Sequence, residues 1–283
     1  MAEAIDIEIS PFELAVDRLE GRIPVASRLR TADWDQVPAA IRERAQFSAA
    51  VDDLRTMQGV QDKLVEWAEL GRRDPDRAFM DRSKFVAEMR QEMGAAEGDP
   101  GSLTDIASRR RLELIYDFQT QDAMEFGRWK MSQDPEVLSS FPAQELVRIE
   151  ERRDKRNWVE RWRGAGGRVF PGGTDPDFGG GRLVALKTDP VWTRISRFGK
   201  PWPPFDFGSG MGVEDVGVDE AVELGLLAGE DQAGIGGSHS SPLQGFAETE
   251  FSAEGMDGDL VGELVRAFAG KLALEGGMLR WLS

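Results

Sequence analysis

Hydrophobic residues recur at helical spacing through the first two-thirds of the chain. Apolar positions three or four residues apart predict amphipathic helices in five segments: 11–21, 35–70, 81–93, 134–139 and 142–162. A break is expected near Gly59. The longest pattern runs from Ser102 to Met131 and predicts a long central helix. We therefore expect a mainly α fold in which residues 1–164 form a helical body.

The pattern changes after Gly164. Glycine-rich sequence leads into an alternating segment at 182–187, which predicts a short strand with residues 168–170 as its partner. Residues 219–227 have the pattern of one short helix. We expect residues 165–228 to form a small mixed α+β region.

That region contains the unusual stretch PWPPFDFGSGMG at residues 201–212. Its prolines exclude a helix and disfavour a strand, yet it carries large apolar side chains that a chain normally buries. One interpretation is that this loop docks on the helical body. The other is that Trp202 and Met211 anchor a partner protein.

The sequence of the C-terminal part predicts a tether followed by a helix. Residues 229–256 are polar and rich in glycine and serine, which predicts a linker, so truncation after Ala228 is expected to leave the body folded. Residues 257–283 predict an amphipathic helix with an apolar stripe that includes Leu264, Phe268 and Leu272. An isolated helix of this length is marginal in water, so the stripe needs a cover. Either the chain's own body or a partner protein could cover the stripe, and we favour a partner protein.

The net charge of −16 is unevenly distributed. Residues 213–283 hold 3 basic and 14 acidic residues, whereas residues 145–202 hold 13 basic and 8 acidic ones. A strongly acidic protein does not coat nucleic acid as a whole, which disfavours a free-standing DNA-binding or regulatory protein.

The locally basic segment is a candidate for contacts with a partner. Its candidate contact residues are Arg152, Arg156, Trp158 and Trp162. The simplest alternative is that the arginines pair with nearby acids four residues away on a helix. A third interpretation is non-specific contact between residues 148–168 and DNA.

Residue types suited to catalysis are scarce. The chain has no cysteine, and its one histidine, His239, falls in the predicted linker. Asp175 and Asp177 form an Asp-x-Asp pair in a turn-like setting, and the glycine-rich GAGGRVF lacks the lysine and hydroxyl of a phosphate loop. We expect no catalytic residue, no metal site and no cofactor. No apolar run approaches the roughly 18 residues of a membrane span, and no secretory signal is visible.

Several segments, taken in order, resemble one family. PFELAVDRLEGRIP near the start, MDRSKFVAEMRQEM, LELIYDFQTQDAMEFGRWK and DPVWTRISRFGKPWPP are similar to landmarks of the phage Mu F-like minor head proteins, also called phage head morphogenesis proteins. In the third landmark, Tyr116, Ala123, Gly127 and Arg128 hold the family pattern, while Phe118 and Gln119 stand in place of a usual Thr-Asn pair. The cysteine-bearing element that follows the paired prolines in many members is missing.

The resemblance implies a structural role in the virion of a tailed phage or prophage. The expected protein is a minor capsid protein, made in the host cytoplasm, that acts in head morphogenesis at the portal or inner head surface. Its implied partners are the portal protein, the major capsid protein, or both, and self-association is left open. The alternative class is an enzyme domain, modifying nucleotides or peptides, carried on such a scaffold; the lack of a recognisable nucleophile or nucleotide motif argues for a structural protein, not an enzyme.

Overall fold

The computed structural model describes residues 10–73, 82–95, 98, 101–152, 155–227, 249–268 and 270–282. Over the described residues the chain is 46% helical and 16% strand, with 11 helices and four small sheets. This is a mixed α/β architecture, so the expectation of a mainly α fold built on a long central helix is wrong. The error comes from strands that are short and lie between helices.

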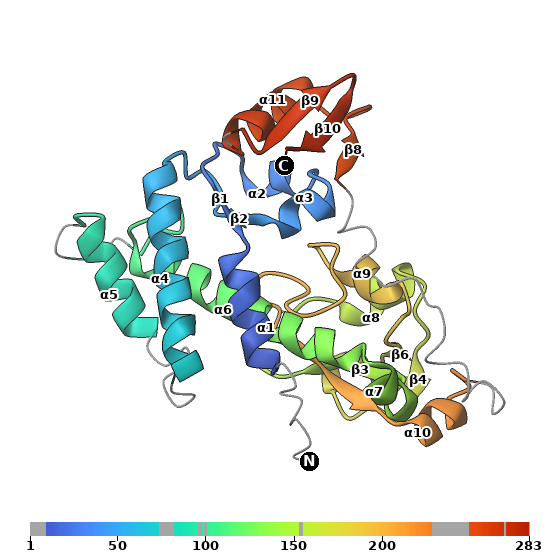
Figure 1. Cartoon of the computed structure of the whole chain (residues 1–283). Coiled ribbons are helices and arrows are strands. Elements are labelled where there is room, and N and C mark those ends of the chain that lie inside the picture. The colour runs from blue at the N-terminus through green and yellow to red at the C-terminus, as the bar shows by residue number, and fades with distance from the viewer. Residues whose placement is uncertain are drawn as a thin grey trace, which may run out of the picture.

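Four helices form one side of the molecule: α1 (Pro11–Glu20), α4 (Leu54–Arg73), α5 (Arg82–Glu92) and α6 (Arg109–Ser132). Helix α6 runs behind α1, and α4 and α5 lie beside its first half (Figure 1). Ser10 begins α1 with a capping box, accepting from the Glu13 amide while the Glu13 carboxylate accepts from the Ser10 amide. Ser108 is the N-cap of α6, so this helix begins seven residues after Ser102, where its pattern was expected to start.

The segment between α1 and α4 is more broken than its apolar spacing predicts. It forms β1 (Ile23–Val25), α2 (Thr31–Trp34), α3 (Ala39–Glu43) and β2 (Ala45–Phe47), with β1 and β2 paired in parallel. The expected break at Gly59 is wrong, because Gly59 lies inside α4. A Cβ atom there would meet side-chain atoms of Glu92 and Met89 at the ordinary contact distances of 3.7 and 3.8 Å, so this glycine lies beside α5 and does not end the helix.

A three-stranded antiparallel sheet follows α7 (Pro135–Ser140). Its central strand is β3 (Ala143–Arg148), flanked by β6 (Val184–Leu186) and β7 (Met211–Val216). The helical prediction over 142–162 is therefore wrong at β3 and holds only for α8 (Trp158–Gly164). The predicted pairing is partly right: β4 (Phe170–Pro171) pairs with β5 (Gly181–Arg182), but β6 pairs with β3.

The remaining short elements of this region are η2 (Pro176–Phe178), α9 (Val191–Ile195) and α10 (Val218–Glu223). The buried residues of η2 and α9 pack beside α8 around Trp162 and Trp192, whose rings meet edge to face at 5.0 Å. Ala221 of α10 packs instead against the three-stranded sheet, in a cluster with Ala143 and Val216. The proline-rich stretch runs across this region and is buried from residue 201 to residue 206.

The C-terminal part is not one helix. It consists of β8 (Glu250–Ser252), α11 (Gly258–Ala267), β9 (Leu272–Glu275) and β10 (Met278–Trp281). Gly276 and Gly277 have φ of 58° and 81°, the left-handed values that a two-residue hairpin turn requires, so they join two strands rather than interrupt a helix. Of the predicted linker, residues 229–248 lie outside the described residues.

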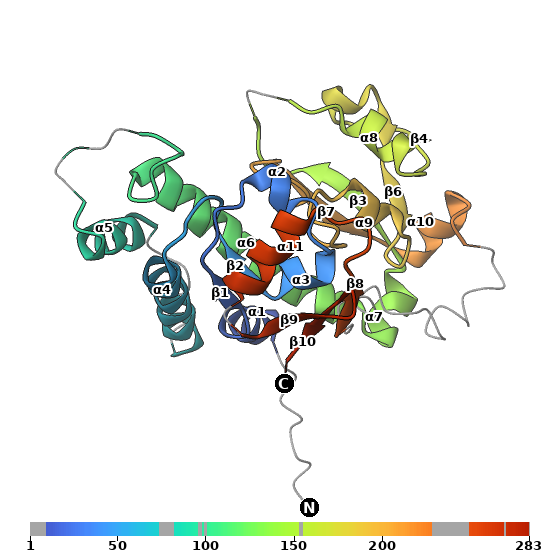
Figure 2. The same cartoon turned by 90° about the horizontal axis from the view of Figure 1, so that it is seen from above.

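This C-terminal unit packs on the chain's own N-terminal part. Figures 1 and 2 show α11 lying over α2 and α3. Its buried Leu264, Phe268 and Leu272 belong to one apolar cluster with Val25 and Ile41. In this structure the chain's own N-terminal part covers the stripe, so the cover by a partner that we favoured is wrong here. Truncation after Ala228 would remove this cover from Val25 and Ile41, and the expectation that the body then stays folded remains a prediction.

A cavity in this apolar cluster should destabilise the whole chain. Phe268 is 1% exposed, so Phe268→Ala is expected to lower the free energy of unfolding by about 3–5 kcal/mol. The matched control is Leu274→Ala on β9, whose side chain is 48% exposed and whose loss should change stability by less than about 0.5 kcal/mol. Chemical denaturation of both variants measures this. Equal, small effects would show that the unit is not docked.

Docking of α11 should also depend on pH through Glu263. Its carboxylate accepts from Arg266, from the amide of Arg28 (2.8 Å) and from Oγ of Ser27 (3.2 Å), and these bonds lower its pKa to about 2. Because the folded pKa lies below the ordinary value of about 4.3, the stabilisation is complete above that value and disappears as the pH falls towards about 2.

Glu263→Gln removes this titration. We expect the difference in unfolding free energy between the original protein and the variant to shrink as the pH falls from about 5 to about 2. Parallel denaturation series over that range measure it. A difference that stays constant with pH would rule out a stabilising role for the ionised carboxylate.

Candidate functional site

A buried carboxylate lies at the centre of the helical part. Asp122, on the inner face of α6, is 0% exposed. Its Oδ1 accepts from Lys200 Nζ and from Trp202 Nε1 (3.0 Å). Its Oδ2 accepts from Arg22 and from both Nε and Nη2 of Arg18 (3.1 and 3.0 Å). One carboxylate thus holds three cations from two distant segments.

A second carboxylate completes this charge cluster. Glu43, at the end of α3, pairs with Arg18, and Arg22 also donates to the side-chain oxygen of Gln119. The cluster therefore contains three cations and two carboxylates in a nearly dry environment.

Burial and the neighbouring cations have opposite effects on the pKa of Asp122. Burial alone would raise the pKa of Asp122, but Arg18, Lys200 and Arg22 outweigh it and hold the pKa well below its usual range. Burial lowers the pKa of both Arg22 and Lys200, which Asp122 only partly offsets. With three cations and two carboxylates, the cluster carries a net positive charge.

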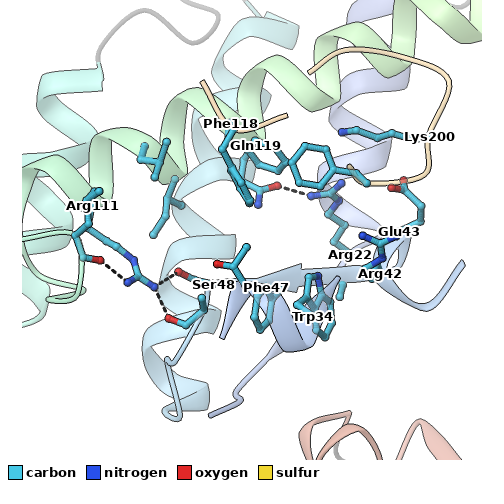
Figure 3. Close-up of a pocket in the computed structure, with 18 residues that line it drawn as sticks. Arg22, Trp34, Arg42, Glu43, Phe47, Ser48, Arg111, Phe118, Gln119 and Lys200 are labelled. Atoms are coloured by element: carbon cyan, nitrogen blue, oxygen red, sulfur yellow. Dashed lines mark hydrogen bonds between the residues drawn. The ribbon is translucent and has the colours of Figure 1, made fainter. Parts of the chain in front are cut away.

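A cavity of about 270 Å³ opens beside this cluster, between α6, the β2 segment and the loop around Lys200 (Figure 3). Its cationic lining residues are Arg22, Arg42, Arg111 and Lys200. Its aromatic lining residues are Trp34, Phe47, Phe118, Phe198 and Phe207. Glu43 is the single carboxylate of the lining.

The charges gather at two ends of the cavity. Figure 3 shows Arg111 at one end and Arg42, Glu43 and Lys200 towards the other, with Phe118 between them. Arg111 is held by neutral acceptors: the carbonyls of Leu103 (2.6 Å) and Ala49, and Oγ of Ser48 (2.8 Å).

Arg42 is held in a similar way, donating to the carbonyl of Arg197 (3.1 Å). Among the described residues, no carboxylate forms an ion pair with Arg42 or Arg111. Burial lowers the pKa of both guanidinium groups, as it does for Arg22 and Lys200. For each of the four lining cations, the loss of hydration on burial outweighs the attraction of nearby carboxylates. A bound anion would favour their charged forms, so the cavity is suited to an anion.

Most of the residues expected to contact a partner are instead internal. Seven side chains are buried: Trp158, Trp162, Trp202, Met211, Leu264, Phe268 and Leu272. Trp202 shows why, because its ring lies 4.9 Å from that of Trp129 and its Nε1 reaches Asp122. These apolar side chains stabilise the chain's own core. Of the two interpretations of residues 201–212, the structure therefore agrees with docking on the body.

The two predicted arginines lie nearer the surface. Their side chains are about one-third exposed, Arg152 at 37% and Arg156 at 36%. Arg152 pairs with Glu150, and Arg156 lies 3.3 Å from Asp206. Both cations are therefore already balanced within the chain.

Two further cations of the basic segment are also paired within the chain, whereas Arg163 and Arg168 are exposed and form no ion pair with a described carboxylate. Arg148 pairs with Asp175 (3.4 Å) and Asp177 (3.0 Å), and Lys155 pairs with Asp177 (2.9 Å). The Asp-x-Asp turn thus balances arginine and lysine. Lys155 with Glu151 (3.6 Å) is the one described pair in this segment at the spacing expected for a helix.

Sequence reasoning singled out none of the four cavity cations. They are spread over nearly 180 positions and have no shared spacing. The available signal was Asp122, a charged residue on the same helical face as Ile115, Gln119 and Ala123. A charge on such a face requires buried cations from elsewhere in the chain.

The described residues contain no helix long and apolar enough to cross a membrane and no group of three or more His, Cys, Asp or Glu side chains placed to hold a metal ion. His239 lies outside the described residues. No family model, curated protein or solved structure that was compared with the chain matches it.

Removing the charge of Asp122 should be far more damaging than removing an exposed one. Asp122→Asn keeps the shape but leaves buried cations unpaired, and we expect it to lower the unfolding free energy by about 3–5 kcal/mol. Asp117→Asn, one turn away, breaks a half-exposed pair with Arg82 and should cost less than about 1 kcal/mol. Denaturation curves measure both. Equal losses would contradict a central role for the buried cluster.

Proposed function

We propose that this protein is a minor head protein of a tailed phage or prophage, with a structural role in head morphogenesis at the portal or inner head surface. Its proposed partners are the portal protein, the major capsid protein or both, and it works by contact rather than by catalysis. The proposal places it in the virion after synthesis in the host cytoplasm.

The observation that carries this proposal is the meeting of three landmark segments at Asp122. The first supplies Arg18, the third supplies Asp122 itself, and the last supplies Lys200 and Trp202. Chance similarities scattered along a chain have no reason to share one contact centre. Their convergence supports reading the landmarks as parts of one architecture.

Gly127 strengthens the same point. A Cβ atom at this position would lie 1.9 Å from the carbonyl oxygen of Pro11, so any side chain would force α1 away from α6. Two residues of the resemblance, in different landmarks, thus depend on each other through a close backbone approach.

Fractionation of a lysate that contains the assembled particles tests the proposal. We expect the chain to sediment with heads or procapsids at low copy number and to remain there after nuclease treatment, which excludes tethering through DNA. Quantitative mass spectrometry of the gradient fractions measures it.

The control is the same chain expressed without the other head genes, which should stay at the top of the gradient. If the chain stays there in the presence of heads as well, the proposed role in the virion is wrong.

A further inference from the structure

The cavity beside Asp122 has features that a structural role in the head does not require. We propose that it binds a nucleotide, defined here as a planar heteroaromatic base joined to a phosphate, of about mononucleotide size. This inference does not depend on the proposed function, since binding can be measured with the isolated full chain.

The charge of the cavity lining favours an anionic ligand. Four cations line the cavity against one lining carboxylate, and Asp122 behind it balances only part of the excess. This positive site lies in a chain of net charge −16, so it is a local arrangement and not a reflection of overall composition.

The end formed by Arg22, Arg42 and Lys200 also holds Glu43, and both Arg22 and Lys200 pair with Asp122 behind it. At this end Nε of Arg22 and Nε of Arg42 are both buried and have no hydrogen-bond partner within the described part of the chain. Buried N–H groups left unpaired are costly, and phosphate oxygens are strong acceptors for arginine. A phosphate has more acceptor oxygens than a carboxylate, which fits an end with two unpaired arginine N–H groups.

The aromatic side chains in the cavity walls favour a ligand that contains a flat ring. Trp34 and Phe47 stack on each other with centroids 4.0 Å apart and an interplanar angle of 7°. On the other side, Phe118 packs against Phe198 and Phe207 at 5.0 and 5.1 Å. Bases bind to such aromatic surfaces by stacking, and arginine side chains add to this interaction.

Size and access set the length of the ligand. A volume of about 270 Å³ lies just below the roughly 300–1,000 Å³ usual for small-molecule sites, which favours a single nucleotide over a longer chain inside the cavity. Leu103 and Leu114 line it and are 41% and 37% exposed, so the cavity reaches solvent at the Arg111 side. The phosphate then lies at the inner end, with the base between the Phe47 and Phe118 walls.

Calorimetric titration of the full chain with adenosine, guanosine, cytidine and thymidine 5′-monophosphates tests the proposal. We expect binding that weakens with added salt, and at least about tenfold weaker binding of the matching nucleosides and of inorganic phosphate. The absence of binding by all four monophosphates at millimolar concentration to a folded protein would overturn it.

Variants separate the cavity from the surface. Arg42→Gln and Arg111→Gln should each weaken binding by about tenfold, because each removes a charged donor. Arg28→Gln, whose side chain is 79% exposed and outside the cavity, should leave affinity unchanged. Arg22 and Lys200 are not substituted in this test, because both pair with the buried Asp122 and their loss would destabilise the fold.

An exposed position gives a test that spares the fold. Leu114→Glu adds a carboxylate at the mouth and should weaken binding by about tenfold, whereas Leu114→Gln should not. Equal affinities for both Leu114 variants, together with unchanged binding in the Arg42 and Arg111 variants, would place the ligand elsewhere and refute the proposal.

The source of the nucleotide is distinguished in the same titrations. A single-stranded oligonucleotide with a 5′-phosphate that binds as tightly as a monophosphate, while its 5′-hydroxyl form does not, would identify the end of a strand. Binding by the monophosphates alone would identify a free nucleotide. Either result supports the assignment, and tight binding of both oligonucleotides independent of the 5′-phosphate contradicts it.

Discussion

The buried charge of Asp122 constrains much of this structure. A carboxylate removed from water is tolerated only when cations and hydrogen-bond donors surround it. Here they come from Arg18 of α1, from Arg22 two residues beyond its end and from the loop around Lys200. Each of these segments must therefore be in place before the others are stable. The same requirement explains the proline-rich loop, since Trp202 donates to Asp122 and packs beside Trp129.

The sequence predicted those elements that local signals define. Ser10 and Pro11 mark the start of α1, and Asp134 and Pro135 mark the start of α7, where the structure places them. Strand β3 was missed because its sequence, AQELVR, does not alternate cleanly: Ala143 and Gln144 are both buried. As the central strand, it is determined by β6 and β7, which come much later in the chain.

The cavity was less predictable than the fold. A motif is visible in a sequence when its residues keep a fixed spacing, and Arg22, Arg42, Arg111 and Lys200 keep none. The aromatic and leucine residues that stood out in the sequence were informative about packing instead, since large apolar side chains are most often buried. The C-terminal stripe was read correctly as apolar but placed on a helix, because the paired glycines can interrupt a helix or turn a hairpin.

The packing of the C-terminal unit on residues near the start of the chain has a consequence for synthesis. Val25 and Ile41 are buried against residues as distant as Leu279, so their cover is made roughly 230 positions later. At about 5–20 residues per second, a ribosome needs on the order of 10 to 50 s to produce it. During that interval the emerging chain exposes an apolar surface, and its completion requires closing one of the longest loops available, which slows folding. The surface around Val25 and Ile41 therefore has to stay protected from aggregation until the C-terminal unit has been made.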